Sequence, residues 1–74
     1  MAYVATLAAR QSQQGRTVIE FNLVDDAGVL PYERIQCHFP TETPTNAEIL
    51  AARNARRDEA RDRAIARLKE LDDQ

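Results

Sequence analysis

The 74-residue sequence predicts an α+β domain in which a three-stranded antiparallel β-meander is followed by one long C-terminal α-helix (β-β-β-α). Short runs rich in β-branched and aromatic residues, separated by glycine-containing turns, occupy the first half. A charged stretch without glycine or proline occupies the last third and is typical of a helix. We therefore expect a single domain over residues 1–74, with the meander in 1–39, a connection in 40–45 and the helix in 46–72.

The first two strands are predicted at Tyr3–Gln11 and Arg16–Asp25. Between them, a three-residue loop of residues 13–15 would place Gly15 in the left-handed conformation that favours glycine. This loop predicts the cross-strand pairs Ala5 with Leu23, Leu7 with Phe21 and Ala9 with Ile19. The same register predicts a core face composed of Tyr3, Ala5, Leu7, Ala9, Ile19, Phe21 and Leu23. A slip by one residue would mix apolar and polar side chains on both faces.

The third strand follows a turn at residues 25–28, which begins with two aspartates and ends with a glycine. Pro31 interrupts the next apolar pattern, and proline within a sheet is confined to edges and bulges. The regular strand is therefore predicted at Glu33–Phe39. Its core-facing residues are Ile35, Cys37 and Phe39. The predicted outer face of the sheet carries Arg10, Glu20, Asn22, Arg34, Gln36 and His38.

A capping box at residues 45–48 indicates where the helix begins. In this motif, the side chains of Thr45 and Glu48 each accept a hydrogen bond from a backbone N–H that has no partner inside the helix. We therefore expect the helix to begin at Asn46, after a short extended connection over residues 40–44.

The apolar residues of the helix share an arc of about 160° when each residue is assigned about 100° of rotation. They are Ile49, Leu50, Ala60, Ala64, Ile65, Leu68 and Leu71. Arg53, Arg57 and Arg61 lie within the same arc, and the acidic residues spread over the opposite side. The three arginines have three interpretations. In the first, the arginine stems lie along a half-buried helix, and the guanidinium groups are in water or paired with Glu20 or Glu33. In the second, the guanidinium groups contact carboxylates of another chain. In the third, they contact nucleic acid.

The length of the helix favours the second interpretation. A helix over residues 46–72 is about 40 Å long, whereas a strand of seven to nine residues covers about 25–30 Å. A straight helix would therefore extend beyond the sheet, so that Ile65, Leu68 and Leu71 lack cover from their own chain. Either the helix breaks in its middle or this end packs on another protomer, and the absence of glycine and proline from the helix favours the second arrangement. The predicted intermolecular contact comprises Arg53, Arg57, Arg61, Ala64, Ile65, Leu68 and Leu71.

Residue types that support catalysis or cofactor binding are scarce. One cysteine and one histidine exclude an internal disulfide and most zinc-ligand sets, and two isolated glycines cannot form a phosphate-binding loop. Cys37 and His38 are neighbours on a strand and point to opposite faces, so we interpret Cys37 as a core residue and His38 as a surface residue. Asp25 and Asp26 are interpreted as turn residues. We predict no enzymatic activity, no catalytic, cofactor-binding or metal-binding residues, and no small-molecule substrate.

The sequence favours a non-enzymatic protein–protein interaction module, or a structural or accessory protein, that self-associates through its helix or binds another protein. The small core available to a chain of 74 residues supports association. The alternative is a nucleic-acid-binding β-β-β-α module that uses the outer face of the sheet or the arginine face of the helix. A net charge of −2 weighs against that alternative. A third class, an enzyme subunit that contributes a site only within a complex, stays open.

No basic region precedes the apolar run at residues 2–9, and no run approaches the length of a membrane span. We therefore expect no secretory signal and no membrane contact. The single cysteine suits a reducing cytoplasm. A composition rich in alanine and arginine suits a bacterial or phage source, and a phage protein of this kind would be expected in an assembled particle.

Overall fold

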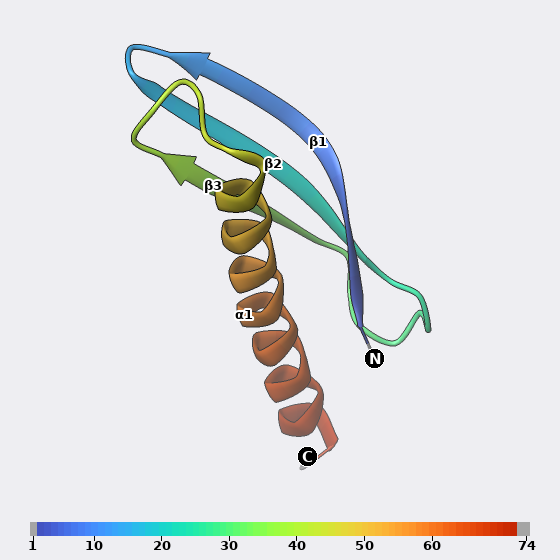
Figure 1. Cartoon of the computed structure of the whole chain (residues 1–74). Coiled ribbons are helices and arrows are strands. Elements are labelled where there is room, and N and C mark those ends of the chain that lie inside the picture. The colour runs from blue at the N-terminus through green and yellow to red at the C-terminus, as the bar shows by residue number, and fades with distance from the viewer. Residues whose placement is uncertain (1, 73–74) are drawn as a thin grey trace.

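The computed structural model describes residues 2–72, which form three strands and then one helix (Figure 1). The elements are β1 (Tyr3–Gln13), β2 (Arg16–Asp25), β3 (Glu33–Phe39) and α1 (Asn46–Asp72). The strands form one antiparallel sheet in the order β1-β2-β3, and α1 covers one face of it. This arrangement confirms the predicted β-β-β-α fold and the predicted bounds of β2, β3 and the helix.

The turn between β1 and β2 is shorter than predicted. Gln13 pairs with Arg16, so only Gln14 and Gly15 connect the strands. Both have positive φ angles, 53° and 75°, as a two-residue type I′ turn requires. The predicted three-residue loop is therefore wrong, although Gly15 does adopt the left-handed conformation. This turn is favoured because its backbone twist matches the right-handed twist of the two strands.

A bulge in β1 compensates for the shorter turn. The predicted pairs of Ala5 with Leu23 and of Leu7 with Phe21 are confirmed, but the register shifts between Leu7 and Ala9. Ala9 then lies opposite Glu20, and Arg10 lies opposite Ile19. The predictions for Ala9 on the core face and Arg10 on the outer face are therefore wrong. One extra residue in a bulged strand exchanges the faces of all residues beyond it.

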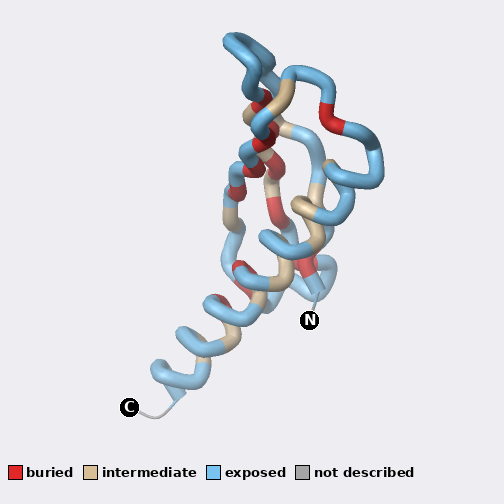
Figure 2. The backbone as a smooth tube through the Cα atoms, turned by 60° about the vertical axis from the view of Figure 1, so that its left-hand side comes forward, coloured by how far each residue is buried: buried red, intermediate tan, exposed pale blue. Residues whose placement is uncertain are grey.

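The core lies between the sheet and α1, and buried positions alternate with intermediate or exposed ones along β2 and β3 (Figure 2). Its buried apolar residues are Tyr3, Ile19, Phe21, Leu23, Leu30, Ile35, Cys37, Phe39, Ala60 and Ala64. The helix contributes only alanines to this fully buried set. Because alanine has a small side chain, the helix backbone lies close to the sheet at Ala60 and Ala64.

The predicted capping box holds the start of α1. Thr45 Oγ1 accepts a hydrogen bond from the backbone N–H of Glu48 at 3.2 Å, and Glu48 Oε1 accepts from the backbone N–H of Thr45 at 3.3 Å. The connection that precedes the helix is tied to the sheet by Thr17, whose Oγ1 donates to the carbonyl oxygen of Thr41 at 2.7 Å. These contacts fix the point at which the chain leaves the sheet and enters the helix.

The turn between β2 and β3 is organised by the Asp25 carboxylate, which confirms the interpretation of this residue. Asp25 Oδ2 accepts from the backbone N–H of Leu30 at 2.8 Å and of Val29 at 2.9 Å, and Oδ1 accepts from Ala27 at 3.0 Å. The hydrogen bond from Leu30 and those from Ala27, Val29 and Ala2 hold the pKa of Asp25 below its usual value, although burial acts in the opposite direction.

Replacing this carboxylate should remove a pH-dependent contribution to stability. Because the folded-state pKa of Asp25 is lowered, its contribution is fully present above the unfolded-state pKa and is lost as the pH falls through the folded-state pKa. Asp25→Asn should therefore lower the urea midpoint at about pH 7, and the difference from wild type should shrink in acid. The control is Asp26→Asn at the exposed neighbouring residue. A constant difference across the pH range would contradict this account.

Candidate interaction surfaces

α1 covers the sheet unevenly, because it packs mainly against β3 and less against β1. Leu7 of β1 lies opposite the buried Phe21, and paired residues of neighbouring strands share a face. Leu7 therefore lies on the helix-covered face of the sheet, yet 63% of its surface is exposed. The β1 side of this face is open to another molecule.

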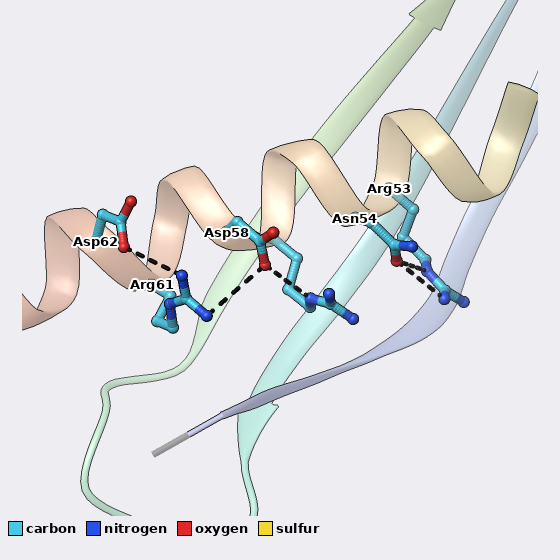
Figure 3. Close-up of polar contacts among 6 residues, drawn as sticks. Arg53, Asn54, Asp58, Arg61 and Asp62 are labelled. Atoms are coloured by element: carbon cyan, nitrogen blue, oxygen red, sulfur yellow. Dashed lines mark hydrogen bonds and ion pairs between the residues drawn. The ribbon is translucent and has the colours of Figure 1, made fainter.

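A row of three arginines runs along α1, and we call Arg53, Arg57 and Arg61 the arginine row. Their spacing of four residues places them on one side of the helix, as Figure 3 shows for Arg53 and Arg61. All three are half-buried, as expected when arginine stems lie along apolar surface.

Each arginine of the row contacts the polar side chain that follows it in the sequence (Figure 3). Arg53 Nη2 donates to Asn54 Oδ1 at 3.2 Å, Arg57 Nε to Asp58 Oδ1 at 3.3 Å, and Arg61 Nη2 to Asp62 Oδ1 at 3.4 Å. Within residues 2–72, none of them forms an ion pair with Glu20 or Glu33, two partners considered from the sequence. The row and its acids form an alternating strip of charge on one side of the helix.

The apolar residues of the predicted contact have different environments. Ala64 is buried in the chain's own core, and Ile65 and Leu68 are partly buried against that core. Leu71 is 68% exposed. The expectation that Ile65 and Leu68 lack cover from their own chain is therefore wrong. Ile65 adjoins the buried Ala64 and Leu68 lies about one turn beyond it, so the core extends to this part of the helix.

Leu50 completes the surface beside the arginine row. It lies three residues before Arg53 and seven before Arg57, so it shares their side of the helix. Its surface is 47% exposed, although its position in the apolar arc of the helix predicts contact with the sheet. Leu50 and Leu7 are thus two large apolar residues, one on α1 and one on β1, that the chain does not cover itself.

The outer face of the sheet carries a network of polar side chains that contact one another. Glu20 forms an ion pair with Arg34 at 3.6 Å and accepts a hydrogen bond from Gln36 Nε2 at 2.7 Å. Asn22 Oδ1 accepts from Tyr32 Oη at 2.6 Å and from Arg34 Nε at 3.3 Å. Four predicted outer-face residues thus contact one another, and His38 is exposed on the same strand face as Arg34 and Gln36. Arg10 does not join them.

A hollow of about 460 Å³ lies where β3 meets α1. It is lined by Arg34, Ile35, Gln36, His38, Arg56 and Arg63. This site was not predicted from the sequence, because only the arginines that lie within the apolar arc were considered, and Arg56 and Arg63 border that arc. Their spacing of seven residues, two turns on one side of a helix, was the available signal.

Cys37 and His38 point to opposite faces of β3, as their adjacency predicts. Cys37 is buried in the core and His38 is exposed. Burial raises the pKa of the Cys37 thiol, and the charge of Arg56 acts in the opposite direction. In residues 2–72 no group of three or more His, Cys, Asp and Glu side chains is arranged to hold a metal ion.

Comparison with protein-family models, with curated proteins and with solved structures finds no match to this chain. The helix of the described region is not apolar enough to cross a membrane. The proposed function therefore depends on the surfaces described above.

The burial of Cys37 makes its reactivity a measure of folding. In the native protein a thiol-specific reagent should react with Cys37 far more slowly than in urea, because the thiol is enclosed and its raised pKa reduces the thiolate fraction. The labelling rate is followed by absorbance as urea is increased, with free cysteine as the control. Equal rates in native and urea-unfolded protein would show that Cys37 is not enclosed.

Proposed function

We propose that the chain is a non-enzymatic protein–protein interaction module whose partner is a second copy of itself. The observation that carries this proposal is the exposure of large apolar residues on the helix and on the β1 side of the sheet: Leu50 shares a side of α1 with the arginine row, and Leu7 is exposed on the helix-covered face. A second helix packed there would remove apolar surface from water and bring new carboxylates to the guanidinium groups.

The charged strip on α1 is complementary to itself when two copies lie antiparallel. About a two-fold axis between residues 57 and 58, Leu50 of one helix faces Ile65 of the other. Between these apolar ends, two pairs bring an arginine to a polar oxygen. They are Asn54 with Arg61, and Arg57 with Asp58. A parallel arrangement in register would instead place each arginine beside its own copy.

The size of this contact favours a reversible dimer. The helix from Leu50 to Ile65 is about 23 Å long, so a contact made by two such segments lies at the low end of the size range of specific interfaces. The exposed ion pairs within each chain contribute little stability, so exchanging them for partners in the second copy has a small cost. The proposed role is that of a small structural or accessory protein, and its bacterial or phage origin stays a prediction from composition.

Self-association should depend on Leu50. Leu50→Asp should raise the dissociation constant of the dimer about tenfold or more, because dimerisation would desolvate the aspartate carboxylate against an apolar surface of the partner. Light scattering across a dilution series measures the molar mass. The matched control is Val4→Asp on the outer face of the sheet, where the valine is 44% exposed. A wild-type monomer at every concentration would refute the proposal.

The antiparallel register is tested separately at the pair of Asn54 and Arg61. Asn54→Arg should weaken the dimer about tenfold, because two arginines then face each other twice across the axis, and Arg61→Asp should weaken it by removing the guanidinium group that faces Asn54. The double variant should recover most of the lost affinity, because an arginine then faces an aspartate. These residues are seven positions apart on one helix, about 10 Å, whereas side-chain pairs within one helix are three or four positions apart, so recovery reports on contact between the chains. A double variant weaker than both single variants would contradict this register.

A further inference from the structure

The open edge of β3 is a second surface that the proposed dimer does not use. In the sheet order β1-β2-β3, β3 pairs with β2 on one side and with no strand of residues 2–72 on the other. Backbone N–H and C=O groups along such an edge can pair with a strand from another molecule. The seven residues of β3 provide a usable length for this pairing.

The hollow lies along this edge. Its lining includes residues from both faces of β3, with Ile35 from the core face and Arg34, Gln36 and His38 from the outer face. Because residues of both faces reach it, the hollow follows the edge of the strand. Its other wall is α1, which contributes Arg56 and Arg63. The floor is therefore strand backbone with an apolar side chain, and three arginines surround it.

The charge around the hollow is predominantly positive. Two of the arginines contact exposed or half-exposed carboxylates, Arg34 with Glu20 at 3.6 Å and Arg56 with Glu59 at 3.7 Å. Within residues 2–72, Arg63 forms no ion pair within 4.0 Å. Exposed pairs of this kind exchange readily for another carboxylate, since each contributes little stability.

We propose that this hollow binds an extended acidic peptide as a fourth strand paired with β3. The backbone of the peptide would pair with the strand edge, and its carboxylates would meet Arg34, Arg56 and Arg63. This combination uses both observations, the open edge and the cluster of arginines. Nucleic acid would use the arginines but not the strand edge, and the net charge of −2 opposes its approach.

The site is independent of self-association. In helical rotation, Arg56 and Arg63 lie roughly 100° or more from Arg57 and Arg61, and they line the hollow beside β3. A peptide in the hollow therefore leaves Arg57 and Arg61 free. Leu50→Asp, which should separate the copies, is expected to bind the peptide as tightly as wild type, so failure of one proposal leaves the other intact.

The test uses the full chain and a fluorescent seven-residue peptide of alternating glutamate and valine, with binding followed by anisotropy. Lysine in place of glutamate should abolish binding. Arg56→Glu combined with Arg63→Glu should weaken binding of the glutamate peptide roughly 25-fold, about fivefold for each exposed charge contact. Arg67→Glu, on the same helix but outside the hollow, is the matched control and should retain most of the affinity. Circular dichroism confirms that each variant is folded.

Strand pairing is tested by methylating alternate backbone nitrogens of the peptide. One set of alternate nitrogens points toward β3 and the other points away, so only one of the two methylation patterns should abolish binding. Equal binding of both methylated peptides, equal binding of the lysine peptide, or no effect of the double charge reversal would each overturn the proposal. Tighter binding of single-stranded oligothymidylate, weakened by the same charge reversal, would also overturn it by identifying the hollow as a nucleic-acid site.

Discussion

A single helix has to cover one face of a three-stranded sheet, and this constraint determines which surfaces of the molecule are available. Strands lie about 4.8 Å apart, and a helix with its side chains is about 10–12 Å across. Ala60 and Ala64 bring α1 close to the sheet, but mainly over β3. The β1 side therefore keeps Leu7 exposed on a face whose other residues form the core.

The position of α1 gives its two flanks different neighbours. The flank toward β1 carries the arginine row and the exposed Leu50, beside uncovered apolar surface. The flank toward β3 carries Arg56 and Arg63, beside a strand edge. Arginine suits both flanks, because its stem packs on apolar surface while its guanidinium group reaches a carboxylate. The same residue type thus favours a helix partner on one side and an extended partner on the other.

Local signals in the sequence predicted the fold well. The capping box at Thr45 and Glu48, the turn at Asp25 and the opposite orientations of Cys37 and His38 depend on residues within a few positions of one another. The bulge between Leu7 and Ala9 depends instead on a choice between two turn lengths. The three-residue turn pairs Leu7 with Phe21 directly, and the two-residue turn gives the same pair only together with the bulge. The apolar pattern did not distinguish these arrangements because alanine fits either face. Arg10 was misplaced for this reason.

The candidate sites were harder to predict because they depend on how α1 lies across the sheet. The seven-residue spacing of Arg56 and Arg63 places them on one side of the helix, but it does not indicate that this side approaches β3. Nor does any periodicity indicate that Leu50 stays exposed within the apolar arc. The arrangement also couples the two proposals. A two-fold dimer through the arginine row would carry two hollows on its outer flanks, away from the contact. A partner with two acidic segments could then bind both at once, and the second binding event would benefit from a raised effective concentration. Peptide affinity at one hollow would be unchanged by dimerisation, whereas avidity for such a divalent partner would depend on it.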